Sequence, residues 1–339
     1  MPDQPSPRTR AGASAGERGG ALLASAARPA RSLARGGGRL RPLGCCLLLL
    51  LLLSACGGGG GSTDSGGSPP PDPGLSALDD EFSTGPSLDA GWQRVWQVEQ
   101  WPFDQLQSLD VGVTRPGWLT LVPYASTWYQ DYRGELAFKP VTGDLVVTTH
   151  IEARNRAGTG APASLYSLAG IMLRAPRQVT PATWTAGGED YVFLSLGCGD
   201  TPGTYQTEVK TTVDSVSTLA LDPGPGAATL RAARVGPHLL LLIRPEGGSW
   251  AVHRRYRRDD FPATLQVGIT VYTDWTTCSA LTPTQHNTSL ITSGSPDLRA
   301  QVDYVRFEDA VVPTALLGAD LSNPAAVSDA QVLAWLGTD

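Results

Sequence analysis

The sequence predicts an all-β domain made of two packed antiparallel sheets. Three stretches, "DLVVTTHIEA", "DYVFLSLG" and "LQVGITVY", alternate apolar and polar residues with the period of two that is typical of half-buried strands. Clusters of turn residues at 115–117, 222–226 and 245–248 separate such stretches. The 339 residues also include 39 glycines, 27 prolines and only 17% charged residues, a composition that suits many short strands. Helices should therefore be few.

One short helix is expected at the C-terminal end. Ser328 followed by Gln331 forms a capping box, and Gly337 lies where a helix from Asp329 to about Leu336 would end. We therefore expect a sandwich domain over residues 79–310 and an extension with a short helix over residues 311–339.

The first 55 residues predict an export signal. Residues 1–41 are Arg-rich, and the apolar stretch 45–53 is too short to cross a bilayer as a helix. The tetrapeptide "LSAC" that ends at Cys56 resembles the bacterial lipobox, in which the cysteine receives a diacylglyceryl group and becomes the new N-terminus. This resemblance implies lipidation of Cys56 and a membrane anchor. Cleavage after Ala55 without a lipid and a retained hydrophobic anchor are the alternatives.

Residues 56–78 are predicted to be the lipidated cysteine and a linker. Five consecutive glycines, several serines and a Pro-Pro-Pro run cannot bury apolar surface, so this stretch suits a stalk between a membrane and a folded domain. Gly57 stands where some bacteria use Asp as an inner-membrane retention signal. The expected location is therefore the bacterial cell envelope, at the outer membrane or the cell surface.

The charge of the exported part argues against nucleic-acid binding. The whole chain carries a formal charge of −6, but residues 1–56 hold eight arginines against Asp3 and Glu17, so the remainder carries −12. Neutralisation of phosphates supplies most of the affinity of nucleic-acid-binding proteins. An acidic domain without a basic stripe does not fit that class.

Two segments resemble a known family. "DDEFSTGPSLDAGW" (79–92) and "AQVDYVRFED" (300–309) are similar to the first and last strands of laminarinase-type glucanases and of the concanavalin A-like lectin/glucanase superfamily. Between them, "GDLVVTTHIEAR", "LAGIMLRAP" and "RVGPHLLLLIRPEGGSWAVHRRY" follow an order similar to that of exported bacterial domains of the superfamily. The resemblance implies a two-sheet jelly-roll sandwich with one concave face.

The catalytic pattern of those glucanases is absent. They need Glu-x-Asp-x-x-Glu on one strand, and the sequence contains no such string, so we assign no catalytic residue. His150 and Glu152 would share one strand face, where a general acid/base pair is conceivable. A solvated polar face is the favoured interpretation.

The predicted domain contains two cysteines, Cys198 and Cys278. In an oxidising exported setting they most simply form one disulfide. A nucleophilic cysteine acting with a histidine is the alternative.

Aromatic residues beside polar ones indicate a carbohydrate site. Sugars stack their C–H faces on aromatic rings and need polar partners for their hydroxyl groups. The resemblance also places one arginine on the concave face. The candidate ligand-binding residues are Trp128, Tyr129, Arg174, Trp184, Tyr272, Asp274 and Trp275. Core or edge packing is the alternative for the three tryptophans among them.

The resemblance further implies a structural Ca²⁺ on the convex face. In the similar glucanases, oxygens of the first strand and an aspartate of the last strand bind the ion, which corresponds here to Asp80 or Glu81 and to Asp303. Carboxylate oxygens suit Ca²⁺, although the same residues also suit a surface turn.

The leading hypothesis is an exported, lipid-anchored protein whose jelly-roll domain binds a polysaccharide or another glycan without cleaving it. The alternatives are a glycan hydrolase with a different catalytic arrangement and a structural or protein-interaction lipoprotein. The sequence leaves open the glycan and the oligomeric state.

Overall fold

The computed structural model of the protein describes residues 74–83, 85, 87–89 and 91–338. The predicted leader, the lipidation site Cys56 and most of the linker lie outside the described residues. None of the helices within these ranges is long and apolar enough to span a membrane.

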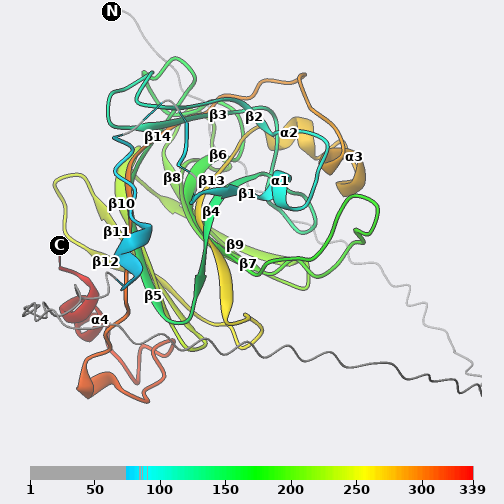
Figure 1. The fold of residues 1–339 in the computed structure, drawn as a ribbon. Helices are drawn as coiled ribbons and strands as arrows, with labels where there is room; N and C mark the ends of the chain where they lie inside the picture. The colour runs from blue at the N-terminus through cyan, green and yellow to red at the C-terminus, as the bar shows by residue number, and fades with distance from the viewer. Residues whose placement is uncertain (1–73, 84, 86, 90, 339) are drawn as a thin grey trace, which may run out of the picture. The chain divides into compact units, whose positions relative to one another are not determined.

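Two antiparallel sheets of seven strands each pack face to face (Figure 1). Sheet I has the strand order β1-β4-β13-β6-β7-β8-β9, and sheet II has the order β12-β11-β10-β5-β14-β3-β2. The strands of sheet I are β1 (Gln93–Arg94), β4 (Glu135–Thr142), β6 (Ser167–Arg174), β7 (Tyr191–Cys198), β8 (Gln206–Val213), β9 (Val216–Pro223) and β13 (Thr264–Tyr272). Those of sheet II are β2 (Leu106–Val111), β3 (Leu119–Pro123), β5 (Leu145–Arg154), β10 (Ala227–Val235), β11 (His238–Pro245), β12 (Ala251–Arg257) and β14 (Arg299–Glu308). The predicted all-β, two-sheet jelly-roll fold is confirmed.

The helices are short, as the composition predicts. They are η1 (Gly74–Leu78), α1 (Val95–Val98), α2 (Trp275–Cys278), α3 (Pro283–Asn287), η2 (Thr314–Leu316) and α4 (Asp329–Leu336). The capping box of α4 forms as expected, because Ser328 Oγ accepts a hydrogen bond from the Gln331 amide at 3.3 Å and the Gln331 side chain reaches back to Ser328. Gly337 caps the helix with φ −93° rather than in the left-handed conformation.

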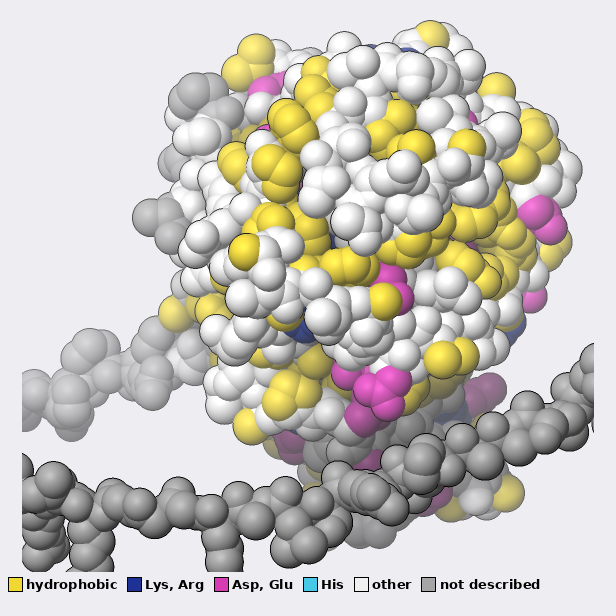
Figure 2. All heavy atoms as spheres, turned by 90° about the vertical axis from the view of Figure 1, so that its right-hand side faces the viewer, with side chains coloured by type: hydrophobic (Ala, Val, Ile, Leu, Met, Phe, Trp, Pro, Cys, Tyr) yellow, Lys and Arg dark blue, Asp and Glu magenta, His cyan; other side chains and the backbone are white. Residues whose placement is uncertain are grey.

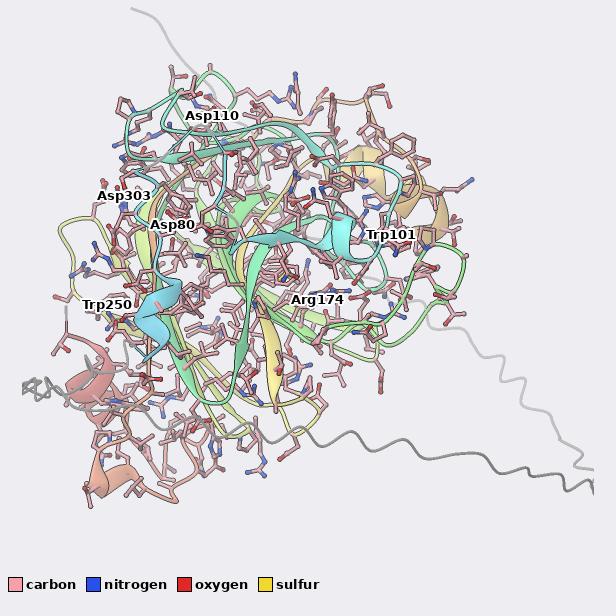
Figure 3. The ribbon with its side chains drawn as sticks, in the orientation of Figure 1. Asp80, Trp101, Asp110, Arg174, Trp250 and Asp303 are labelled. Carbon is pink, nitrogen blue, oxygen red and sulfur yellow. The ribbon has the colours of Figure 1, made fainter. Side chains whose placement is uncertain are left out.

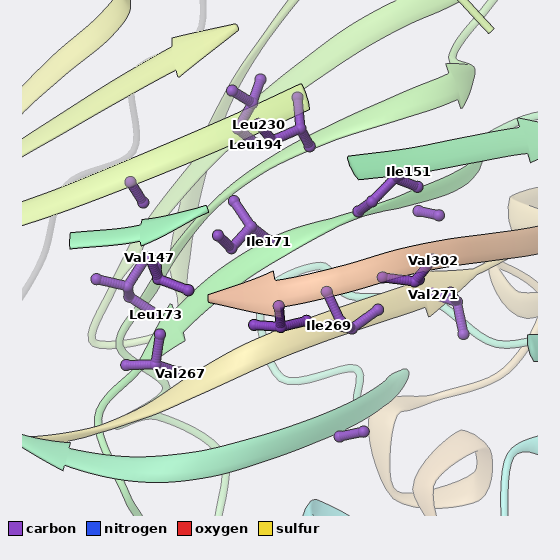
Figure 4. Packing of buried hydrophobic residues seen from close by; sticks show 14 of the residues in the cluster. Val147, Ile151, Ile171, Leu173, Leu194, Leu230, Val267, Ile269, Val271 and Val302 are labelled. Atoms are coloured by element: carbon purple, nitrogen blue, oxygen red, sulfur yellow. The ribbon is translucent and has the colours of Figure 1, made fainter. Parts of the chain in front are cut away.

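The main core lies between the sheets and follows the period of two. In β13, for example, Leu265, Val267, Ile269 and Val271 are fully buried members of this core. Figure 4 shows such residues from both sheets in one cluster, with Val147, Ile151 and Val302 from sheet II and Ile171, Leu173, Val267 and Ile269 from sheet I. The alternate residues of each strand therefore point to the outer faces of the sandwich.

The outer face of sheet II is partly covered by the C-terminal extension. Val332 and Leu336 of α4 pack in a second apolar cluster with Leu240, Leu242 and Trp250 of the sheet II region. Arg231 of β10 fixes the end of this segment, because its Nη1 donates hydrogen bonds to the carbonyl oxygens of Leu336 and Thr338.

The outer face of sheet I carries large aromatic residues. Trp128, Tyr191, Phe193 and Tyr272 are buried there in a third cluster, together with Phe138 and Met172. The 124–134 connection between β3 and β4 covers this cluster, since it supplies Trp128. Side chains that a two-layer sandwich would expose are thus buried under a loop.

Candidate functional site

A pocket opens on the outer face of sheet I. Its volume is about 190 Å³, and it is lined by Thr127, Tyr129, Tyr166, Lys210, Leu219 and Trp275. Lys210 and Leu219 come from the paired strands β8 and β9, and the other four residues come from connections outside the sheet. Figure 2 shows the side of the molecule that carries α2 and α3 in Figure 1, where apolar side chains gather and few charged ones appear.

The turn between β8 and β9 sets the register of the pocket floor. Asp214 and Ser215 both have positive φ, 45° and 63°, as two-residue hairpin turns require. The hairpin pairs Lys210 with Leu219. Ser215 Oγ also donates a hydrogen bond to Asp131 Oδ1 at 2.6 Å, which ties the turn to the covering connection.

Aromatic rings hold the wall of the pocket. Trp275 meets Tyr129 and Tyr132 edge-on, with ring centroids 5.3 and 5.9 Å apart, and Tyr166 at 6.4 Å. Edge-to-face pairs of this kind stabilise the orientation of the rings. Tyr132 is fixed further by a 2.6 Å hydrogen bond from its hydroxyl to the Leu281 carbonyl oxygen. The wall is therefore preorganised.

Lys210 provides the positive charge at the pocket. Its Nζ donates a 2.6 Å hydrogen bond to the Trp128 carbonyl oxygen and lies 2.9 Å from Glu208 Oε1. The rings of Tyr129, Phe193 and Tyr272 surround the ammonium group at 5.4, 5.2 and 5.7 Å, distances typical of cation–π contacts. The side chain of Lys210 is only 2% exposed, so its position is fixed.

The carboxylate of Glu208 lies beneath Lys210 and is contacted at both oxygens, by Lys210 and by Tyr272. The Tyr272 hydroxyl donates a 2.8 Å hydrogen bond to Glu208 Oε2 and lies 3.1 Å from Ser195 Oγ. Burial raises the pKa of Tyr272 well above its ordinary value, and the Glu208 carboxylate raises it further, so the phenol stays protonated and donates. The ammonium, the carboxylate and the phenol therefore form a closed polar chain that is electrically balanced.

Two residues of α3 position the covering connection. His286 Nε2 accepts a hydrogen bond from the Thr127 amide at 3.3 Å, and Asn287 Oδ1 accepts one from the Arg133 amide at 3.0 Å. Burial lowers the pKa of His286 to about 4, so the imidazole is neutral and its Nδ1 donates to Asn287 Oδ1 at 2.9 Å. Sequence analysis missed both residues. The capping box of α3, formed by Thr282 and Gln285, was the available local signal.

Besides Tyr272, four of the predicted ligand-binding residues have structural roles. The Trp128 ring is fully buried, donates to the Glu135 carbonyl oxygen at 3.1 Å and packs against Tyr191, so it offers no face to a ligand. Asp274 caps α2, where it accepts from Thr277 and from the Ser295 amide at 2.7 Å. Trp184 does not line the pocket and meets Trp101 edge-on at 6.1 Å. Tyr129 and Trp275 lie in the pocket wall, and Tyr272 lies below it.

Arg174, the fourth, belongs to a buried charge cluster on the same sheet face (Figure 3). Its guanidinium lies 3.0 Å from Glu189 and 2.7 Å from Glu99, and it donates to Gln266 at 2.7 Å. Burial raises the pKa of Glu189, but the guanidinium groups of Arg174 and Arg177 lower it more, so the carboxylate stays charged. Arg174 was predicted to contact a ligand, but in this structure its side chain is fully buried and paired with these carboxylates.

Arg133 completes the charge cluster with a guanidinium group that makes no hydrogen bond to the described residues. None of its three guanidinium nitrogens has a hydrogen-bond partner in the part of the chain that the structure describes. The group lies 5.0 Å from the Trp101 ring, and burial lowers its pKa to about 10.

The polar stripe on sheet II does not form an acid/base pair. Glu152 is bound by Arg115 at 2.8 Å and by Arg154 at 3.2 Å, while His150 lies against the Trp118 ring and 3.7 Å from Glu246. This arrangement is the partly solvated polar face that the alternation favours.

The three carboxylates of the proposed calcium site have different surroundings. Both oxygens of Asp80 accept hydrogen bonds, from the Phe82 amide and from Trp92 Nε1, each at 2.8 Å. Glu81 is paired with Arg306, and Asp303 lines a groove with His150 on the outer face of sheet II. No cluster of three or more His, Cys, Asp or Glu suited to a metal occurs within the described residues. Calcium binding stays a prediction.

The structure does not contain the predicted disulfide. Cys198 and Cys278 are both free and buried. Cys198 Sγ lies 3.5 Å from the Thr201 carbonyl oxygen, whereas Cys278 packs in a small cluster with Ala125 and Ile291. Burial raises the pKa of Cys198 to about 11, so it is an unreactive thiol at neutral pH, which also disfavours a nucleophilic role.

Comparisons with known proteins give matches of structure alone. No protein-family model and no curated protein matches the chain. Among solved structures, a functionally unknown protein from Saccharomyces cerevisiae is similar with a TM-score of 0.45 and 13% identity, covering 69% of this chain and 100% of that one. A xylan β-1,4-xylosidase from Bacillus halodurans gives 0.44 and 18%, covering 68% and 39%. Lectin I-B4 from Griffonia simplicifolia gives 0.39 and 12%, covering 66% and 95%.

Proposed function

We propose that the protein binds carbohydrate in the pocket on sheet I. The observation that carries this proposal is the combination of a fixed aromatic wall with an ammonium group at its floor. Trp275 and Tyr129 offer apolar surface for the C–H groups of a sugar, and Lys210 and Thr127 offer polar groups for its hydroxyls.

Binding without hydrolysis fits the chemistry of the pocket better than catalysis. Retaining hydrolysis needs two carboxyl groups about 5–5.5 Å apart that flank the scissile bond. The nearest acid on the same strand face, Glu208, is fully buried, and its oxygens face Lys210 and Tyr272. The six residues that line the pocket include no carboxylate.

A screen of the full-length protein on a glycan array tests the proposal. Trp275→Ala should weaken any detected binding about tenfold or more, since an aromatic anchor is lost. Trp118→Ala is the matched control, because this half-buried tryptophan lies beside His150 on sheet II. The proposal fails if the wild-type protein binds no glycan, or if both variants lose the same affinity.

We also propose that the chain is anchored through lipid on Cys56 and works at the cell envelope. The lipobox-like tetrapeptide and the linker composition support this. The start of the described chain does not obstruct the pocket, since Asp80 pairs with Val305 of β14 in sheet II.

Mass spectrometry of the mature N-terminus tests the anchor. The expected chain begins at an acylated Cys56 and sediments with membranes, and Cys56→Ser should leave it unacylated. Cys46→Ser is the control, since it lies before the cleavage point and should change neither result. A mature chain that keeps its leader, or that begins at Cys56 without lipid, would contradict the proposal.

A further inference from the structure

We propose that the pocket selects one uncharged sugar ring at the end of a glycan chain, and that Glu208 sets this selectivity by neutralising Lys210. The inference rests on the proposed function and names the class of ligand.

The size of the pocket limits the ligand to one ring. A cavity of about 150 Å³ holds a single benzene molecule, whereas pockets for larger ligands measure about 300–1,000 Å³. At about 190 Å³, this pocket accommodates one six-membered ring with few substituents. An internal residue of a polysaccharide needs a passage for the chain on both sides, so the end of a chain fits better.

The charge balance favours a neutral ring. A carboxylate on the sugar would have to compete for Lys210 with Glu208, which already lies 2.9 Å from the ammonium nitrogen. The carboxylate would also approach Glu208 itself, and like charges at close range are strongly unfavourable. The negative charge already reaches the pocket wall. Burial raises the pKa of Tyr166, and the Glu208 and Asp200 carboxylates raise it further.

The charge of Lys210 also disfavours a positively charged sugar ring. Aromatic walls attract ammonium ligands, but here the rings of Tyr129, Phe193 and Tyr272 already surround the ammonium group of Lys210. A second cation in the pocket would meet that charge.

Lys210 keeps one hydrogen-bond donor for the ligand. An ammonium group has three N–H donors. One is used by the Trp128 carbonyl oxygen, and the ion pair with Glu208 at 2.9 Å takes up a second side of the ammonium group, while Lys210 itself lines the pocket. The third donor suits a hydroxyl or ring oxygen of a neutral sugar.

Matched oligosaccharides test the selectivity on the full-length protein. The probes are the array-positive oligosaccharide, the same compound with its terminal ring oxidised to the uronic acid, and the primary amide of that acid, which has similar size and no charge. We expect the acid to bind about tenfold or more weakly, a difference of ~1.4 kcal/mol, and the amide to recover the affinity. Affinity per molecule should not rise with chain length, because each molecule presents one end.

Glu208→Gln tests the cause of the selectivity. With Lys210 no longer neutralised, the variant should bind the acid at least as tightly as the neutral compound. Unchanged discrimination in a folded Glu208→Gln protein would overturn the role of Glu208. If the variant does not fold, the acid and amide comparison on the wild-type protein decides, and equal binding of the two overturns the inference. Binding that grows with chain length overturns recognition of the chain end. Absence of binding to all glycans would refute the proposed function itself.

Discussion

The two outer faces of the sandwich bury different kinds of groups. Sheet II is covered by an apolar extension around Trp250, and its uncovered part shows the polar alternation of an ordinary half-buried sheet. Sheet I buries arginines, glutamates and a lysine together with aromatic rings beneath the 124–134 connection. Buried charge is costly unless it is paired, and nearly all of these charges have close partners. The difference teaches that one face is packed for stability, whereas the other holds fixed polar groups around a pocket.

Among the predicted changes, removal of Trp128 should have the largest effect on stability and binding, and it tests the difference between the two faces. Trp128→Ala deletes a fully buried ring on the pocket side, and changes of this type cost about 3–5 kcal/mol of unfolding free energy. It should also abolish glycan binding, because the ring anchors the covering connection through Glu135 and Tyr191, and the backbone carbonyl oxygen of residue 128 that accepts from Lys210 would shift without that anchor. Denaturant unfolding and binding of the folded fraction measure the two effects.

Trp250→Ala is the matched control on the other face. Its ring is 8% exposed and packs beneath the C-terminal extension, so a similar loss of stability is expected. Glycan binding by the folded protein should persist. If Trp250→Ala abolishes binding as well, the two faces are not independent.

The fold could be predicted from sequence because alternation and turn residues are local signals. "LQVGITVY" predicted β13, and Ser328 with Gln331 predicted α4, without knowledge of distant contacts. The covering of sheet I could not be predicted this way. Arg174 appears in a strand whose eight residues are all buried, and its partners Glu99 and Glu189 come from other segments.

The site was predicted only in part for the same reason. Tyr129 and Trp275 were identified because their polar neighbours indicate a surface. Trp128 has almost the same neighbours in sequence, yet its side chain points to the sheet while that of Tyr129 points to the pocket. Lys210 was overlooked because its partners lie in three different strands or connections, which no local pattern reveals.

The next largest effect is expected from acidification, which should destabilise the pocket side through His286. The pKa of His286 is lowered to about 4 by burial, from an ordinary 6.5. Because the pKa is lowered in the folded state, the unfolded chain binds the proton more readily. The contribution of the neutral imidazole to the unfolding free energy is therefore complete above pH 6.5 and is lost as the pH falls towards 4. The shift corresponds to about 3 kcal/mol of unfolding free energy.

His286→Gln measures this contribution directly. The variant should be less stable than the wild type at pH 7, and its unfolding free energy should fall less between pH 6.5 and 4. NMR titration of the imidazole in the wild-type protein gives the pKa itself. A midpoint near 6.5 would contradict the neutral, buried imidazole that holds Thr127.

The smallest predicted effects compare the two capping boxes. Thr282 caps α3 beside the pocket, and Ser328 caps α4 on sheet II. Loss of an N-cap hydroxyl costs about 0.5–2 kcal/mol, so Thr282→Ala and Ser328→Ala should destabilise the protein similarly in thermal unfolding. Only Thr282→Ala should also weaken glycan binding, because α3 carries His286 and Asn287, which fix the covering connection. Equal binding by the two variants would show that the position of α3 does not control the pocket.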